Sequence, residues 1–185
     1  PTYLRNTTAY GASPRQRFDI VVNNLAGLAY TTKEIAMTSD GTPWRPLVHA
    51  LDISQAVLRT LQAPIEAVHG QIFNVGENSQ NYRVREIAGI VGEVFPGCEV
   101  TFGSESADNR SYRVSFDKIH RHLPDFRCAW DARAGAVQLR TLFERFQFGS
   151  LARRLSELAD GGAPVAPVAA AHTVSVTAVA AAPED

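Results

Sequence analysis

Apolar residues recur every three or four positions in several stretches of the chain, which is the period of a helix with one buried face. One such stretch follows Asp52 and stops at Pro64, so a helix is predicted there with Asp52 as its N-cap. Asn23 and Asn24 interrupt the apolar pattern of another such stretch, residues 18–30. The predicted helices are residues 18–30, the stretch from Asp52 to Pro64, 84–95, a short segment after Ser115, and 139–146.

Short runs rich in β-branched and aromatic residues lie between these helices and predict strands. Residues 9–17, with Gly11 and Pro14, are expected to form a loop. Strands that alternate with helices indicate an α/β fold. The predicted strands are residues 2–6, 33–38, 46–49, 70–76, 98–103 and 111–115.

Composition narrows the class of protein. The chain has 185 residues, of which 45% are hydrophobic and 20% charged, with a net charge of −1. These values are typical of a soluble globular protein and favour neither nucleic acid nor a membrane as a partner. Cys98 and Cys128 lack the spacing of a metal site, so a reducing, cytoplasmic location is the expectation. The chain starts at Pro1 and enters a predicted strand at once, which suggests the interior of a longer protein.

Arg45 is the first candidate for chemistry, because it stands between Trp44 and Pro46 at the start of a predicted strand. It could be a surface residue whose guanidinium stacks on Trp44. It could instead bind an anion, since the guanidinium fork matches phosphate oxygens and the proline stiffens the backbone. Composition alone leaves both interpretations open.

Other polar positions carry the same ambiguity. Asn23 and Asn24 fit a solvent-facing helix side, or a pocket wall whose amides bind ligand hydroxyls. Arg110 could close over an anion from the side opposite Arg45, or remain a solvated charge. His49, inside an apolar strand, is more often a hydrogen-bonded core residue than a catalyst.

Several segments in a fixed order resemble one family, the C-terminal half of the extended short-chain dehydrogenase/reductase enzymes. More narrowly, they resemble the NAD-dependent epimerase/dehydratase group that acts on nucleotide-diphosphate sugars. The resemblance implies a Rossmann-type α/β fold with a smaller substrate-binding subdomain over residues 1–148. A terminal helix is expected at 149–159, and outside the resemblance the Ala/Pro-rich composition of residues 160–185 predicts a disordered tail. The segments are YLRNTTAYGASPR, NNLAG, SDGTPWRPLVHALDISQAV, GQIFNVGENSQNYRVREIA and DNRSYRVSFDKI.

The resemblance also implies substrate contacts. By position in the family motifs, Arg45 would bind the diphosphate of a nucleotide sugar. The Asn pair, Asn24 in preference to Asn23, would contact the nucleotide or its phosphates. Arg110 would close on the same diphosphate, with Asp108 near the ribose.

Three further residues of the resemblance belong to the loop that lies beneath the nicotinamide and the sugar in this family. Thr7 and Tyr10 would contact the cofactor, which is NAD or NADP. Thr8 stands where many relatives carry an Asn, so it takes the substrate-side position.

Two motifs of the family do not occur in this sequence. There is no glycine-rich strand-to-helix loop for a dinucleotide, and none of the five tyrosines is followed by Lys four residues later. The chain is therefore expected to contain no catalytic residue and no metal site, and whether it is an enzyme by itself stays open. The predicted parent is an NAD(P)-dependent epimerase or dehydratase of nucleotide sugars, with a homodimer as its candidate assembly. The alternatives are a non-catalytic remnant that binds nucleotide sugars or NAD(P), and an interaction protein.

Overall fold

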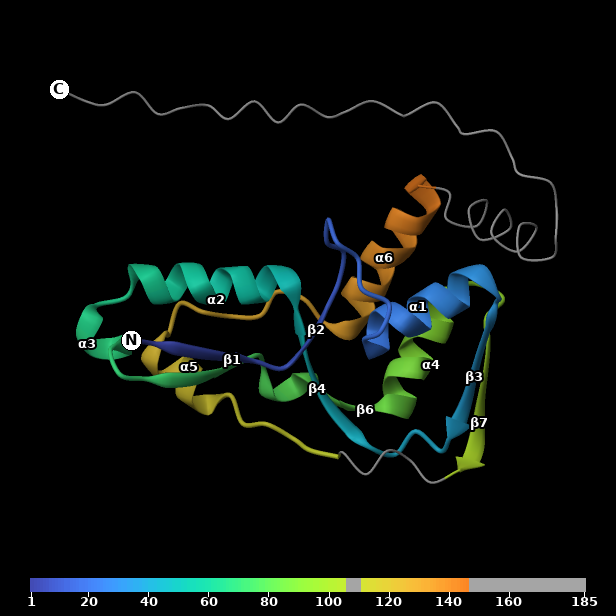
Figure 1. Ribbon diagram of the computed structural model, residues 1–185, viewed down its shortest axis with the longest axis horizontal. Helices are drawn as coiled ribbons and strands as arrows, with labels where there is room; N and C mark the ends of the chain where they lie inside the picture. The colour runs from blue at the N-terminus through green and yellow to red at the C-terminus, as the bar shows by residue number, and fades with distance from the viewer. Residues whose placement is uncertain (106–110, 147–185) are drawn as a thin grey trace.

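The computed structural model describes residues 1–105 and 111–146 (Figure 1). The predicted helix at 149–159 and the predicted tail from 160 lie outside these residues, as do Asp108 and Arg110. Helices and strands alternate along the described chain and three of its strand pairs are parallel, so the predicted α/β class is confirmed. Within the described residues, no helix has the length and apolar character needed to cross a bilayer.

Three small sheets join segments that are far apart in the sequence. In the first, β1 pairs in parallel with β5. In the second, β4 lies between β2, which runs parallel to it, and β6, which runs antiparallel. In the third, β3 pairs in parallel with β7. The strands are β1 (Tyr3–Asn6), β2 (Thr8–Tyr10), β3 (Glu34–Ser39), β4 (Trp44–His49), β5 (Ile72–Val75), β6 (Asn81–Arg83) and β7 (Glu99–Glu105).

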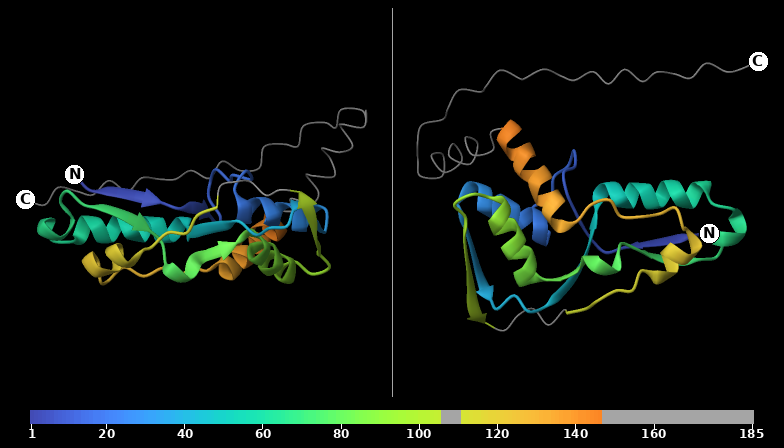
Figure 2. Two further views of the ribbon diagram at one scale, coloured as in Figure 1. Left: turned by 90° about the horizontal axis from the view of Figure 1, so that it is seen from below. Right: turned by 180° about the vertical axis from the view of Figure 1, so that it is seen from behind.

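Two groups of helices flank β4, and each group has its own hydrophobic core (Figure 1). Side chains alternate along a strand, so the buried Leu47 enters the core of α1, α4 and α6, whereas the buried Val48 enters the core of α2, α3 and α5. Figure 2 shows α2 running alongside β1 and β5. The helices are α1 (Val21–Thr31), α2 (Ala50–Gln62), α3 (Ile65–Val68), α4 (Val84–Val94), α5 (Asp117–His122) and α6 (Ala132–Phe146), with a short 3-10 turn at Asn78–Gln80.

Most predicted elements are present, with shifted ends. The helix expected at 18–30 starts only at Val21, and the loop expected at 9–17 gives its first residues to β2. The strand predicted at 111–115 is wrong. The backbone N–H of Val114 donates to the Asn81 side chain at 2.9 Å instead of joining a strand ladder, and side-chain partners of this kind cannot be recognised from alternation.

The prediction that Asp52 caps its helix is also wrong. α2 begins at Ala50, and His49 is the N-cap because its Nδ1 accepts the backbone N–H of Leu51 at 3.1 Å. Asp52 lies in the first turn of the helix, and its carboxylate accepts the backbone N–H groups of Ala129 at 2.9 Å and Trp130 at 3.3 Å. A side chain that looks like a local cap therefore holds a segment almost eighty residues away.

Candidate functional site

Arg45 lies on β4 and is half-buried. The β4–β6 register places Arg45 opposite Tyr82 and Trp44 opposite Arg83. Residues directly opposite each other share a face of the sheet, whereas successive residues of one strand point to opposite faces. Arg45 and Trp44 therefore project to different faces. Arg45 donates from Nη1 to the Trp44 carbonyl at 2.9 Å, a bond that fixes the guanidinium close to the backbone of β4.

The guanidinium groups over the Trp44 ring belong to Arg83 and Arg113, at 5.2 and 4.7 Å from its centroid. Arg85 lies next to this pair in the sequence and stacks over Phe102 at 5.3 Å. The stack of Arg45 on Trp44 that the sequence suggested is therefore replaced by a stack of two other arginines. We call Arg45, Arg83, Arg85 and Arg113 the arginine cluster.

Three members of the arginine cluster, Arg83, Arg85 and Arg113, lack an ion pair within the part of the chain that the structure describes. The α4 N-terminus adds a positive end of a helix dipole beside Arg83, which occupies the N-cap position of α4. The Glu86 carboxylate accepts the backbone N–H of Arg83 at 2.6 Å, so a side chain of the first helical turn caps this end of α4. Several guanidinium groups and a helix N-terminus therefore gather at this end of the β4–β6 ladder, with Glu86 and Asp40 as nearby carboxylates.

The segment that starts at Ser111 lies along β4 at this same end. The backbone N–H of Trp44 donates to Ser111 Oγ at 3.1 Å, and the Tyr112 N–H approaches the Trp44 carbonyl at 3.5 Å. The predicted contacts Asp108 and Arg110 precede this segment and lie outside the described residues. Their roles stay predictions.

The two asparagines of α1 differ in their surroundings. Asn23 is buried, and its side chain accepts the Gly11 N–H at 3.0 Å and donates to the Arg17 carbonyl at 2.9 Å. Asn24 is exposed and donates to the Phe18 carbonyl at 3.0 Å. Asn23 therefore closes the loop between β2 and α1, whereas Asn24 keeps its side-chain oxygen on the surface.

The predicted cofactor contacts lie at the start of this loop. Thr7 Oγ1 donates to the Val75 carbonyl at 3.4 Å, and Thr8 is half-buried in β2 opposite Leu47. Tyr10 is only 2% exposed, and its hydroxyl has no hydrogen-bond partner within the described residues. Burial, with a smaller contribution from Asp52, raises the pKa of Tyr10, so this phenol is neutral.

A buried histidine organises the other side of Tyr10. The His49 ring meets Tyr10 edge-on at 5.2 Å and stacks on Trp130 at 4.2 Å. A Cβ on Gly11, whose φ is +104°, would lie 2.1 Å from His49 Nε2, so glycine is required by both the backbone and the ring. Burial lowers the pKa of His49, although hydrogen bonding to Gln138 and the charge of Asp52 oppose this. The sequence interpretation of His49 as a core residue fits this placement.

Gln138 and Trp130 complete this arrangement, and sequence reasoning identified neither. Gln138 Oε1 accepts the Ala12 N–H at 2.9 Å and lies 2.9 Å from His49 Nε2. One glutamine on an amphipathic helix carries no signal that it reaches a loop 126 residues away. Among the described residues, no cluster of His, Cys, Asp and Glu could hold a metal ion.

Known proteins share this architecture. Residues 1–76 match the model of the NAD dependent epimerase/dehydratase family. An epimerase from Methanothermobacter thermautotrophicus superimposes with a TM-score of 0.66 at 21% identity, over 83% of this chain and 45% of its own. MoeE5, in complex with UDP-glucuronic acid and NAD, gives 0.60 at 25% identity, over 78% and 46%. The ADP-L-glycero-D-manno-heptose-6-epimerase of Helicobacter pylori gives 0.61 at 24% identity, over 76% and 43%.

The fold is therefore the Rossmann-type α/β fold that these solved structures share. The match to the NAD dependent epimerase/dehydratase family model covers residues 1–76 and agrees with the resemblance that the motifs indicated. The chain spans less than half of the length of each of these solved structures.

Proposed function

We propose that this chain supplies the nucleotide-sugar-binding part of an NAD(P)-dependent epimerase or dehydratase. Such an enzyme oxidises a sugar hydroxyl transiently, alters the keto intermediate and returns the hydride. The family match and the relatives support the proposal, because MoeE5 and a UDP-glucuronic acid 4-epimerase from Bacillus cereus are described in complex with UDP-glucuronic acid and NAD.

The observation that carries the proposal is the arginine cluster. A nucleotide diphosphate brings several negative charges, and guanidinium groups bind phosphate oxygens through paired N–H donors. Arg45 approaches from one face of the β4–β6 ladder, and Arg83 and Arg113 lie around Trp44 on the other. We assign the diphosphate to Arg45, with the neighbouring arginines raising the local positive potential.

The remaining predicted contacts are proposed around that anchor. Asn24, which exposes its side-chain oxygen, fits a contact to the nucleotide better than the fully engaged Asn23. Arg110 and Asp108 are proposed to reach the diphosphate and the ribose, because Ser111 is bound to Trp44 beside Arg45. Thr8 keeps its proposed place next to the sugar.

The residues present do not form the cofactor site itself. A dinucleotide pyrophosphate needs a glycine-rich turn between a strand and a helix. The two direct strand-to-helix junctions, at His49 between β4 and α2 and at Arg83 between β6 and α4, contain no glycine. NAD or NADP is therefore proposed as the cofactor of the whole protein, with Thr7 and Tyr10 as this chain's contacts. A homodimer and a cytoplasmic location stay predictions from the sequence.

Isothermal titration of the chain with UDP tests the proposal, with uridine as the ligand that lacks phosphate. We expect saturable UDP binding, no comparable uridine binding, and a loss of roughly 2–4 kcal/mol in binding free energy for Arg45→Ala. Arg59→Ala on α2 is the matched control, because Arg59 lies outside the arginine cluster and bonds only to Gln62 in the described chain. Equal UDP affinity in Arg45→Ala and the parent chain contradicts the assignment of Arg45.

A further inference from the structure

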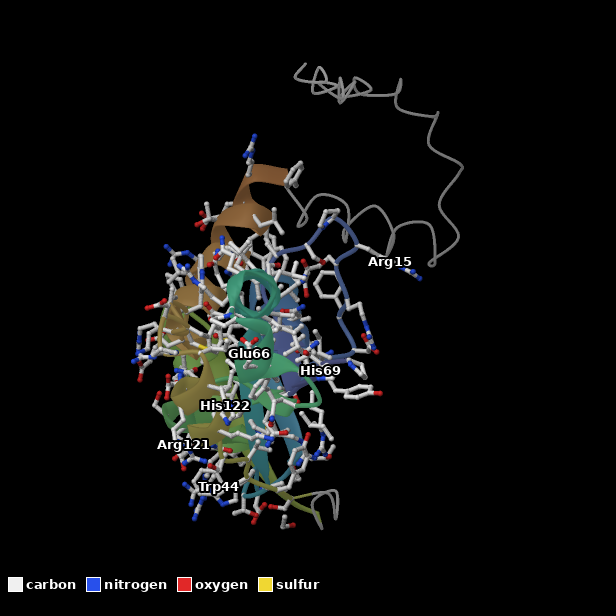
Figure 3. The ribbon with its side chains drawn as sticks, turned by 90° about the vertical axis from the view of Figure 1, so that its left-hand side faces the viewer. Arg15, Trp44, Glu66, His69, Arg121 and His122 are labelled. Atoms are coloured by element: carbon white, nitrogen blue, oxygen red, sulfur yellow. The ribbon has the colours of Figure 1, made fainter. Side chains whose placement is uncertain are left out.

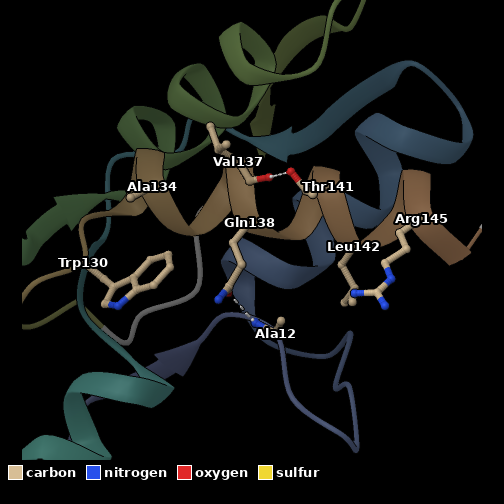
Figure 4. Close-up of a pocket in the computed structure, with 8 residues that line it drawn as sticks. All are labelled: Ala12, Trp130, Ala134, Val137, Gln138, Thr141, Leu142 and Arg145. Atoms are coloured by element: carbon tan, nitrogen blue, oxygen red, sulfur yellow. Dashed lines mark hydrogen bonds between the residues drawn. The ribbon is translucent and has the colours of Figure 1, made fainter.

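Two adjoining hollows lie between the loop after β2 and one face of α6. The first has a volume of about 370 Å³, and Figure 4 shows its lining residues. The second, of about 490 Å³, shares Ala12 and Leu142 with the first and adds Pro14 and Phe146. We call the two hollows together the α6 groove. None of the sequence-predicted site residues lines it, and in Figure 3 the loop that carries Arg15 lies far from Trp44 of the arginine cluster.

The floor of the α6 groove is held rigidly by hydrogen bonds. Gln138 joins α6 to the loop, because its Oε1 accepts the Ala12 N–H at 2.9 Å (Figure 4). Trp130 forms one wall, and its ring stacks on His49 while its backbone N–H donates to Asp52 at 3.3 Å. A wall that is fixed before binding costs a ligand little ordering entropy.

Two side chains of the α6 groove, Gln138 and Arg145, have N–H groups that can donate to a ligand. Gln138 Oε1 already accepts Ala12 N and His49 Nε2, which leaves the amide nitrogen of Gln138 for a ligand. The Thr141 hydroxyl donates to the Val137 carbonyl at 3.0 Å. Arg145 is the single cation in the lining, and no lining residue is acidic. The ligand that matches such a site has acceptor oxygens.

Arg145 differs from the other arginines of α6. Arg133 pairs with Glu93 and Arg140 lies 3.5 Å from Glu144, whereas Arg145 forms no ion pair within the described residues. The rest of the lining is mostly apolar, with Leu142 beside the Arg145 guanidinium and Trp130 at the other end (Figure 4). A cation at one end of an apolar trough fits a molecule with one charged end and a hydrocarbon body.

We propose that the α6 groove binds an organic monoanion with an apolar body, of the class of a medium-chain carboxylate. The carboxylate is bound by Arg145, and the hydrocarbon lies against Leu142 and Pro14. The site is independent of the nucleotide-sugar proposal, because it shares no residue with the arginine cluster.

Isothermal titration of the full chain with decanoate, and with decanol as the uncharged probe, tests this site. We expect saturable decanoate binding and weaker decanol binding. Arg145→Gln should weaken decanoate binding about threefold to fivefold and leave decanol unchanged, since a partly exposed ion pair contributes up to about 1 kcal/mol. Arg133→Gln, on the same helix but outside the groove, is the matched control and should bind decanoate as the parent does.

A second variant tests the place of binding. Ala12 lines both hollows, so Ala12→Phe should fill their junction and abolish binding of both probes, with an unchanged thermal midpoint as the check on folding. The proposal is overturned if decanoate fails to saturate, if Arg145→Gln binds it as tightly as Arg133→Gln, or if a folded Ala12→Phe variant binds it unchanged. UDP affinity measured in the same variants separates failure of this site from failure of the nucleotide site.

Discussion

His49 Nε2 lies 2.9 Å from Gln138 Oε1, and the imidazole is the donor in this hydrogen bond. Its direction follows from the neighbours. Gln138 Oε1 accepts the Ala12 N–H, which identifies this atom as the oxygen, and His49 Nδ1 accepts the Leu51 N–H, which leaves the proton on Nε2. The neutral imidazole therefore connects the start of α2 with α6 and with the loop after β2.

Acid should weaken the fold through His49. Burial lowers the pKa of His49 below its usual 6.5, so the unfolded chain binds a proton that the folded chain excludes as the pH falls through 6.5. The free energy of unfolding should then fall towards acid, by up to about 1.4 kcal/mol per pH unit from this group. The ionisable groups that face His49 are Asp52 and Tyr10, and Asp52 opposes the shift without reversing it.

Urea denaturation followed by circular dichroism from about pH 7 to about pH 5 measures this dependence. His49→Asn is the informative variant, because Asn caps a helix well but does not titrate. It should be less stable than the parent at neutral pH and should lose less stability towards acid. Parallel pH profiles for the two proteins count against His49 as the titrating group.

Asp52→Asn should destabilise the fold by about 2 kcal/mol. The Asp52 carboxylate is 1% exposed and uses both oxygens, one for Ala129 N and the other for Trp130 N. An amide offers one acceptor, so one buried N–H loses its partner. Asp40→Asn is the control, since a single oxygen of Asp40 forms the exposed turn to Thr42 and an asparagine can do the same. Similar chemical denaturation midpoints for the two variants contradict the role of Asp52 as a long-range clamp.

Two helical glycines should respond oppositely to alanine. A Cβ at Gly135 on α6 would lie 2.3 Å from Tyr10 Cε2, whereas a Cβ at Gly89 on α4 meets no atom within 4 Å. Gly135→Ala should destabilise by about 1–3 kcal/mol through overpacking. Gly89→Ala should stabilise by about 0.5–1 kcal/mol through helix propensity. Thermal melts of both variants measure these stability changes. A Gly135→Ala variant as stable as the parent would contradict the close contact with Tyr10.

Removal of the Tyr10 hydroxyl should not harm the fold. The Tyr10 hydroxyl is buried without a partner in the described chain, so Tyr10→Phe should leave the free energy of unfolding unchanged or raise it by about 1 kcal/mol. Tyr3→Phe, at a ring that is 56% exposed, provides the near-neutral reference. A loss clearly larger than that of Tyr3→Phe would show that the Tyr10 hydroxyl has a partner that the described residues lack.

Local patterns in the sequence were enough for most of the helices and strands. The apolar spacing after Asp52, stopped by Pro64, corresponds to α2, and the spacing over 84–95 corresponds to α4. Residues 33–38 and 70–76 become β3 and β5, because runs of this composition have few other stable local states. The motif order also indicated the α/β class and the family, since several motifs in a fixed order restrict the fold more than any one of them.

Contacts between distant segments were decided only by the tertiary structure. Asp52 looks like a helix cap, yet His49 takes that position because its ring is fixed from the other side by Trp130. Arg45 stands next to Trp44 in the sequence, yet strand alternation separates them and register brings Arg83 to the ring instead. Sequence patterns report on neighbours along one element, whereas a buried polar group is satisfied by whatever partner the packing brings within hydrogen-bond distance, as Gln138 is by Ala12.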